Sequence, residues 1–137
     1  MKKLRLCIGS KDGKTVAKTH MGDTCSFYVY DLSEDSTYEF VEKRDNTARD
    51  MEHAKSDKMK AIIELVKDTQ VFVAGQKSPN FVNIAKKTKY QPVIVSADEI
   101  EEVMKMIGES FDEIFALVAK RSEGESFNTI PQLHPAP

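Results

Sequence analysis

The sequence predicts a single α/β domain with a mixed β-sheet that is covered by helices on both faces. Residues 4–8, 25–32 and 38–43 have the alternating or β-branched character of an antiparallel meander. Residues 71–74 and 92–95 are short apolar runs, typical of strands buried on both sides, and helical patterns separate them. With 137 residues, the chain is long enough for one core.

The first strand, Leu4–Ile8, leads into a loop in which Asp12-Gly13 predicts a turn. The stretch Gly9–Thr15 resembles a phosphate-binding loop, but three residues separate its glycines where that motif needs four. No helical pattern follows Thr15, so an ordinary turn is favoured.

The second and third strands are expected to form a hairpin. In residues 25–32, Cys25 and Phe27 fall on one face and Tyr28 and Tyr30 on the other. Turn residues at 33–36 then connect this strand to residues 38–43.

Three helices are expected. The first lies within Met51–Lys67, where Met59, Ile62, Ile63 and Val66 form an apolar stripe. The second opens at Ser78-Pro79 and includes Phe81, Val82 and Ala85. The third follows a capping box at residues 96–99 and continues to about residue 120, with Gly108 as a point of bending.

The last sixteen residues differ in composition from the rest. Beyond Arg121 the chain is rich in Ser, Gly, Glu, Asn and Pro and contains few apolar groups to offset the entropy of ordering. We therefore expect a domain at residues 1–121 and a flexible tail at residues 122–137.

Composition limits the partners and the compartment. Acidic and basic residues number 22 and 20, for a formal charge of -2, so nucleic acid is not an expected partner. No apolar run approaches the roughly 20 residues needed to span a bilayer, and no secretion signal is recognised. Two cysteines without a secretory context indicate reduced thiols and a cytoplasmic location.

One short segment gathers side chains that can bind metals. Thr19–Cys25 contains the imidazole of His20, the thioether of Met21 and the thiol of Cys25. It does not suit structural zinc, which wants four ligands. From the residues alone, Cys25 is more typical of a buried strand residue, and Cys7 is expected in the core. His20 lies in a loop, where function often resides.

Other candidate chemistry is weaker. His53 reads either as a solvated residue near the first helix or as a second ligand facing His20, and His134 in the tail is expected to be incidental. The predicted strands 4–8 and 71–74 contain no acids, which disfavours a nuclease. No nucleophile and base stand at a recognisable spacing, so no enzymatic reaction is assigned.

The whole chain up to about residue 120 is similar to a known family. The similarity is carried by residues 8–16, 19–22, 27–30 and 40–44, and it continues through residues 71–75 and 92–95. The sequence resembles the dinitrogenase iron-molybdenum cofactor biosynthesis domain, the NifX-like family. This resemblance implies a ribonuclease-H-like mixed sheet of five strands with helices on both faces.

The resemblance also implies a function and a set of site residues. Family members bind the iron-molybdenum cofactor, its precursor or a related molybdenum or iron-sulfur cluster. Their histidine-aromatic-glycine motif falls on His20-Met21-Gly22, with methionine in place of the usual phenylalanine. Asp23 stands where the family often has a basic residue, Gly75-Gln76 replaces a glycine pair, and Ser78 replaces a glycine before the proline.

We therefore expect a non-enzymatic carrier of a metal-sulfur cluster, with cofactor-biosynthesis or nitrogenase proteins as partners. His20 is the expected metal ligand, in an open pocket formed by loops 10–24, 46–54 and 75–79. Met21, Gly22 and Gly75 are expected to contact the cluster, and Cys25 and His53 are possible second ligands. Because imidazole must be neutral to bind a metal, and histidine ordinarily has a pKa of about 6.5, binding should weaken below that pH.

An interaction or regulatory module is the alternative. In that reading the tail docks onto another protein through Phe127, Ile130 and Leu133, which stand among prolines.

Overall fold

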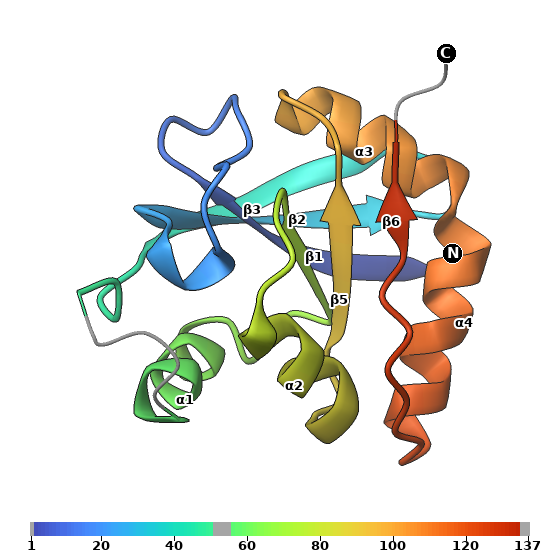
Figure 1. Cartoon of the computed structure of the whole chain (residues 1–137). Coiled ribbons are helices and arrows are strands. Elements are labelled where there is room, and N and C mark those ends of the chain that lie inside the picture. Colours follow the sequence, from blue (N-terminus) through green and yellow to red (C-terminus); the bar gives the residue numbers. More distant parts are fainter. Residues whose placement is uncertain (1, 51–55, 135–137) are drawn as a thin grey trace.

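A mixed β-sheet forms the centre of the computed structural model, which describes residues 2–50 and 56–134 (Figure 1). Across these residues the six strands follow the order β3-β2-β1-β4-β5-β6. The strands are β1 (Lys3–Ser10), β2 (Ser26–Ser33), β3 (Tyr38–Asp45), β4 (Val71–Ala74), β5 (Gln91–Val95) and β6 (Gln132–Leu133). The pairs β1–β2 and β2–β3 are antiparallel, whereas β1–β4, β4–β5 and β5–β6 are parallel.

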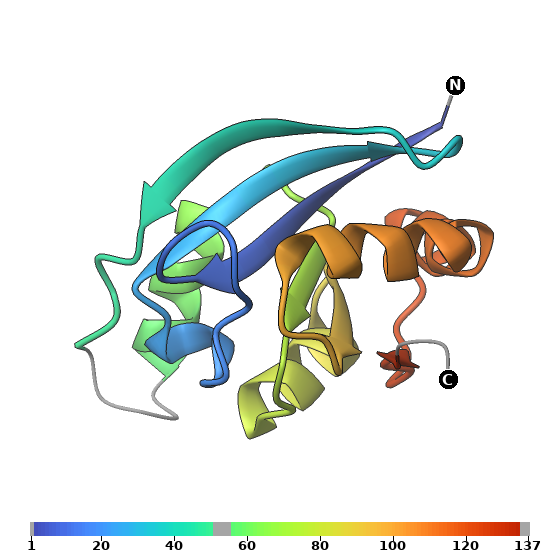
Figure 2. The same ribbon diagram turned by 90° about the horizontal axis from the view of Figure 1, so that it is seen from above.

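Helices cover both faces of the sheet, as the sequence predicts (Figure 2). They are α1 (Ser56–Leu65), α2 (Pro79–Lys87), α3 (Ile100–Glu109) and α4 (Phe111–Ser122), and a short 3-10 turn, η1 (Met21–Asp23), follows β1. Residues of α3 and α4 pack with Leu4, Leu6 and Ile8 of β1 in one core. Residues of α1 and α2 pack with Cys7 of the same strand in the other core. Side chains that alternate along β1 therefore point into the two cores on opposite faces of the sheet.

The predicted faces of the hairpin are confirmed. Tyr30 and Leu32 lie in the α3–α4 core, with Tyr28 packed against it, and Phe27 lies in the α1–α2 core. The predicted burial of Cys7 is also confirmed, since none of its surface is exposed. Cys25, by contrast, precedes β2 and is half-buried, so its assignment to the strand was wrong.

The turn after β1 is held by one carboxylate, and it is a turn rather than a phosphate-binding loop. Asp12 Oδ1 accepts hydrogen bonds from the backbone N–H of Lys14 and of Thr15, each at 2.9 Å. Gly13 has a φ of 78°, in the left-handed region that glycine adopts without strain. The donors on Thr15 and Lys14 lower the pKa of Asp12 to about 2.

Two details of the third predicted helix were wrong. The capping box does not form, because α3 begins only at Ile100 and Glu99 is its N-cap without a side-chain hydrogen bond. Residues 98–100 instead pair with the turn after β1, through Val16 N–H to Asp98 O at 2.9 Å and Ile100 N–H to Lys14 O at 2.8 Å. The single helix to about residue 120 is broken at Ser110, so that α3 packs on β2 and α4 on β5.

The expected five-stranded sheet gains a sixth strand from the segment assigned to the tail. Gln132 and Leu133 of β6 pair with Ile94 and Val95 of β5. The backbone N–H of Ile94 also donates to Pro131 O at 2.9 Å, so the pairing with β5 includes the residue before β6. These bonds use the backbone groups of β5, which would otherwise form an open sheet edge.

None of the helices within residues 2–50 and 56–134 is long and apolar enough to cross a bilayer.

Candidate functional site

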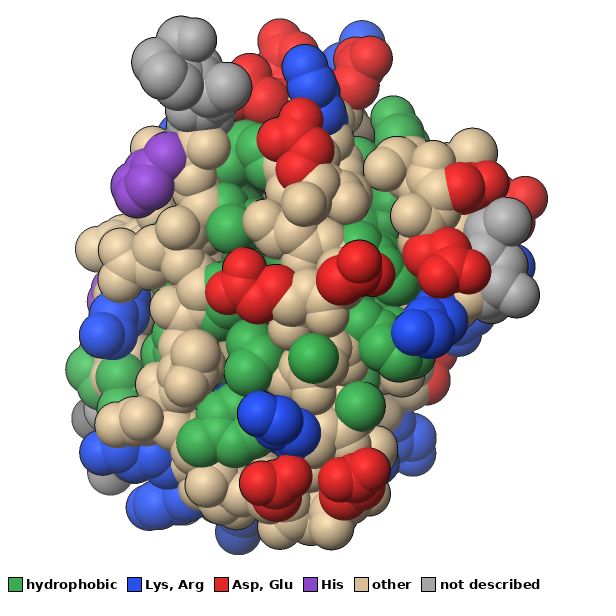
Figure 3. Space-filling view, turned by 90° about the vertical axis from the view of Figure 1, so that its right-hand side faces the viewer, with side chains coloured by type: hydrophobic (Ala, Val, Ile, Leu, Met, Phe, Trp, Pro, Cys, Tyr) green, Lys and Arg blue, Asp and Glu red, His purple; other side chains and the backbone are tan. Residues whose placement is uncertain are grey.

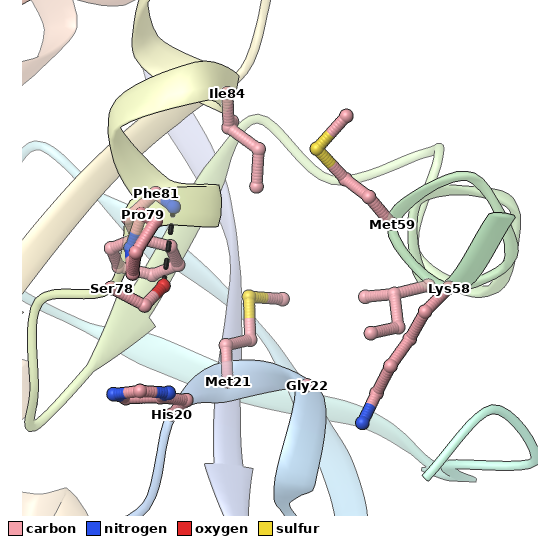
Figure 4. Close-up of a pocket in the computed structure, with 10 residues that line it drawn as sticks. His20, Met21, Gly22, Lys58, Met59, Ser78, Pro79, Phe81 and Ile84 are labelled. Carbon is pink, nitrogen blue, oxygen red and sulfur yellow. Dashed lines mark hydrogen bonds between the residues drawn. The ribbon is translucent and has the colours of Figure 1, made fainter. Parts of the chain in front are cut away.

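A cavity of about 300 Å³ opens beside η1, between the N-terminal half of α1 and the start of α2. Two of its walls come from segments that follow β1 and β4, whose carboxyl ends point to the same edge of the sheet because the strands are parallel. The third wall is α1, which follows β3. Figure 4 shows the side chains that line it. They are His20, Met21, Gly22, Lys58, Met59, Ile62, Ser78, Pro79, Phe81 and Ile84.

The walls are mainly apolar, with a few polar groups at defined places. Met21, Phe81 and Ile84 are at most 5% exposed and belong to the α1–α2 core. The thioether of Met21 enters the cavity from η1, and that of Met59 enters from α1 (Figure 4). His20, Ser78 and Pro79 line the same cavity (Figure 4). An apolar pocket with few polar groups is the usual composition of a ligand site.

The loop that carries His20 is fixed from the side of β3. Asn46 Nδ2 donates to the carbonyl oxygens of Gly22 and Thr24, each at 3.0 Å. The Asn46 backbone N–H also donates to Cys25 O at 3.1 Å. Since Asn46 is 7% exposed, these bonds are shielded from water and hold the loop in one conformation.

Gly22 lies where the loop approaches α1 closely. A Cβ atom at this position would lie 3.1 Å from Ile62 Cδ1 and 3.3 Å from Lys58 Cε. Both atoms belong to side chains, so an added Cβ would require Ile62 and Lys58, or η1 itself, to shift by a few tenths of an ångström beside His20 and Met21.

The opposite wall begins at the N-terminus of α2. Ser78 Oγ accepts a hydrogen bond from the Phe81 backbone N–H at 3.2 Å, and Pro79 occupies the first turn. This confirms the cap that the Ser-Pro pair predicts. The cap also brings Ser78 and Pro79 into the cavity wall.

An ion pair with a buried ammonium joins η1 to α1. Lys58 is 1% exposed, and its Nζ donates to Asp23 Oδ1 at 2.9 Å and to Arg49 O at 3.0 Å. The ammonium therefore ties together the His20 loop, the segment after β3 and α1. Buried lysines are uncommon and are usually paired in this way.

The structure brings together only part of the predicted site. His20, Met21 and Gly22 line the cavity, together with Ser78 and Pro79 from the predicted loop 75–79. Cys25 and Gly75 do not line it. Gly75 lies instead against the segment after β1, where an added Cβ would be 3.2 Å from Ala17 O. His53 lies outside the described residues.

Sequence reasoning missed the contribution of α1. Met59 and Ile62 belong to the stripe that predicts the helix, and they were assigned to the core alone. Lys58 stands four residues before Ile62 and so on the same helical face. A lysine within an apolar stripe was the available signal for a buried charge beside the cavity.

Metal-binding side chains are sparse at the cavity. Within residues 2–50 and 56–134, no three His, Cys, Asp or Glu side chains are grouped so that they could hold a metal ion. Among the described lining residues, His20 is the one strong metal ligand, and the thioethers of Met21 and Met59 are weaker, soft ligands.

Comparison with known proteins adds one match. The family model described as dinitrogenase iron-molybdenum cofactor matches residues 2–110. The matched range includes every residue that lines the cavity and ends between α3 and α4. No curated protein matches the chain.

Proposed function

The chain belongs to the dinitrogenase iron-molybdenum cofactor family, and from this premise we propose that its cavity binds a metal-sulfur cluster and carries it to another protein. The cluster is the iron-molybdenum cofactor, its precursor or a related molybdenum or iron-sulfur cluster. The role is that of a NifX-like carrier and includes no chemical step. The observation that supports it most directly is that the motif His20-Met21-Gly22 lines the largely apolar cavity beside η1.

The lining residues suit a cluster that must later be released. His20 offers one imidazole, and no cysteine or carboxylate stands among the described residues of the wall. The sulfides of such a cluster are soft and weakly hydrogen-bonding, so the thioethers of Met21 and Met59 and the side chain of Ile84 can pack against them. One strong ligand with apolar contacts holds a cargo less permanently than a full set of thiolates would.

The fold supports the same assignment. The mixed sheet with helices on both faces agrees with the general architecture that the family resemblance implies, and it supports the ribonuclease-H-like assignment that we propose. The sixth strand, β6, adds to the far edge and leaves the cavity unaffected.

The tail side chains that would dock onto a partner already make contacts within this chain. Phe127 packs on Arg121, and Leu133 packs against the α3–α4 core while it pairs with β5. A partner that used these side chains would first have to detach them. The carrier is therefore the function that we put first.

Cluster uptake tests the proposal. The protein is purified without oxygen and mixed with the iron-molybdenum cofactor or its iron-sulfur precursor, and bound metal and visible absorption are measured after gel filtration. His20→Ala is compared with wild type, and His134→Ala is the control, because His134 is exposed and does not line the cavity. Stoichiometric uptake by wild type and His134→Ala, lost in His20→Ala, is the expected result.

Carriage is tested separately from binding. Loaded protein is mixed with nitrogenase that lacks the cofactor, and the recovery of nitrogenase activity is followed after the two proteins are separated. We expect activity to return as metal leaves the carrier. Failure of wild-type protein to take up any cluster would overturn the whole proposal, and uptake without transfer would overturn carriage alone.

A further inference from the structure

Exposed apolar side chains gather on one edge strand of the sheet. Among the described residues, the large hydrophobic side chains that are exposed all lie on β3: Tyr38 at 42%, Phe40 at 55% and Val41 at 37%. This strand runs along the outer edge of the sheet (Figure 2), and in the described chain β2 is its one neighbour. Its free edge therefore offers backbone N–H and C=O groups, beside apolar side chains, to another strand.

Neighbouring rings hold the exposed aromatic side chains in place. The centroid of the Phe40 ring lies 5.5 Å from that of Tyr30 and 6.1 Å from that of Tyr28. The ring of Tyr38 meets Tyr30 edge-on, with 6.1 Å between centroids. Because Tyr30 is 8% exposed and belongs to the α3–α4 core, the patch is anchored to the core. Little side-chain freedom remains to be lost when the patch is covered.

The register of the β2–β3 hairpin divides the β3 side chains between the two faces of the sheet. Residues that stand opposite each other in an antiparallel pair share a face, and Val41 is the extra residue of a bulge. In β2, Tyr28 and Tyr30 point to the α3–α4 core and Phe27 points to the α1–α2 core. The side of α3 and α4 therefore receives Tyr38, Phe40, Lys43 and Asp45, and the side of α1 and α2 receives Glu39, Glu42 and Arg44.

This distribution fits a second copy of the same strand. If two β3 strands run antiparallel with Phe40 opposite Lys43 of the second copy, residues 38–40 of each copy meet residues on their own face. Glu39 then stands opposite Arg44 of the second copy, which has the opposite charge. The alkyl chain of Lys43 covers the exposed ring of Phe40 and leaves its ammonium near the ring. Each contact occurs twice, as a two-fold axis requires.

We infer that β3 pairs antiparallel with β3 of a second copy of this chain and so joins two sheets into one across a two-fold axis. The occupant is a second copy because the order of apolar and charged residues on β3 complements itself when it is reversed. The inference goes beyond the proposed function and does not depend on it. No residue of β3 lines the cavity beside η1.

An edge strand can also be protected against pairing. Charged side chains and a bulge are common means of protection, and β3 has both. Protection requires that the charges of two like strands repel each other, as they would in a register with Glu39 opposite Glu42. With Phe40 opposite Lys43, repulsion is replaced by the pair of Glu39 and Arg44.

The charges set the register of the pair more than its strength. Arg44 Nη2 already donates to Asp68 Oδ2 at 2.9 Å, so Glu39 of the second copy would join an existing ion pair. Such additions contribute little at a surface. Covering the side chains of Tyr38, Phe40 and Val41 and pairing the free backbone groups supply most of the stability.

The oligomeric state tests the inference. Sedimentation velocity is run on the full-length protein at rising concentrations up to about 200 µM, because two short strands make a small interface and small interfaces are usually weak. A reductant prevents cross-linking through Cys25. Wild type is compared with Phe40→Lys and with Phe40→Lys/Lys43→Glu. The control is Gln132→Lys, which adds the same charge at an exposed position of β6, the strand at the opposite edge of the sheet.

We expect wild type and Gln132→Lys to form the same dimer. Phe40→Lys should associate at least about tenfold more weakly, because two ammonium groups would face each other across each Phe40–Lys43 contact. The double variant places a carboxylate opposite the new ammonium and should recover the dimer. Circular dichroism establishes which variants are folded.

Hydrogen exchange gives a readout on wild type that needs no variant. The backbone amides of residues 38–45 should exchange more slowly at high protein concentration than at low concentration, and those of β6 should not change. If Phe40→Lys does not fold, this measurement decides.

Three results would overturn the inference. They are a wild-type protein that stays monomeric at about 200 µM, a dimer that persists in folded Phe40→Lys, and a dimer that is lost in Gln132→Lys. The last would place the interface at β6. A double variant that folds but stays monomeric would reject the register with Phe40 opposite Lys43.

Discussion

The guanidinium of Arg121 lies over the ring of Phe127, with 4.1 Å between the guanidinium carbon and the ring centroid. The same group donates from Nε to Gln91 Oε1 at 2.7 Å and from Nη1 to Ala85 O at 2.6 Å. Arg121 is 2% exposed. The end of α4 is thus joined to α2, to β5 and to the segment that becomes β6 (Figure 3 shows this side of the molecule).

Replacing Arg121 should destabilise the fold. Arg121→Met keeps much of the side-chain volume but leaves the buried acceptors on Gln91 and Ala85 without their donor. We expect a loss of about 3 kcal/mol in the free energy of unfolding, because buried unpaired polar groups cost about 1 to 3 kcal/mol each. Urea denaturation measures it. Lys120→Met, at an exposed position on the same helix, should change stability little, and equal effects of the two would contradict the role assigned to Arg121.

The sequence predicts those elements of the fold that have a local side-chain pattern, and it does not predict those that depend on distant contacts. Strands β1 to β5 and helices α1 and α2 follow from local periodicity and from the Ser78-Pro79 cap, because each has a side-chain pattern of its own. The break at Ser110 and the strand β6 depend on contacts with distant segments. The apolar stripe continues through both α3 and α4, so it predicts one helix, and Gly108, the expected point of bending, is the local signal nearest the break.

For the candidate site, sequence reasoning finds two walls out of three, the loop at residues 20–22 and the loop 75–79 with Ser78 and Pro79. The loop motif at residues 20–22 places His20, Met21 and Gly22 at a cavity, and the structure brings them to one. The partners in α1 could not be predicted, because Lys58 meets Asp23 only through the packing of distant segments. Cys25, only five residues after His20, lies away from the cavity because the chain turns through η1 between them.

The hydrogen bonds of Asp12 should stabilise the fold only at a pH at which its carboxylate is ionised. The N–H groups of Thr15 and Lys14 lower its pKa from 3.8 to about 2 in the folded protein. Because the folded value is the lower one, the contribution is complete above pH 4 or so and is lost as the pH falls toward 2. We expect wild type to melt at a higher temperature than Asp12→Ala at pH 6, with the difference shrinking below pH 4. Melting curves from pH 6 to pH 2.5 test this, and a difference that stays constant would contradict it.

The two cysteines should differ in reactivity. Burial raises the pKa of the Cys7 thiol well above its usual value, and none of Cys7 is exposed. Cys25 is free and half-buried. A thiol reagent should therefore modify one cysteine in the native protein and both in denaturant, since the reactive species is the thiolate. In native Cys25→Ser no rapid reaction should remain.

The same variant tests the expected role of Cys25 in the site. Because Cys25 does not line the cavity, Cys25→Ser should take up cluster as wild type does. Loss of uptake in the folded variant would restore Cys25 as a second ligand and would show that the loop rearranges on binding.

A substitution at Gly22 tests the cavity geometry, and a second substitution at Ile62 should reverse its effect. Gly22→Ala places a Cβ atom 3.1 Å from Ile62 Cδ1, so that Ile62 or η1 must shift by a few tenths of an ångström. We expect it to lower the free energy of unfolding by about 1 to 3 kcal/mol, as overpacking does, and to reduce cluster uptake by displacing His20. Ile62→Val removes the Cδ1 atom, so Gly22→Ala/Ile62→Val should recover uptake relative to Gly22→Ala. Double-mutant analysis of stability and uptake measures the coupling. If the two substitutions acted independently, the contact between η1 and α1 would not control the position of His20.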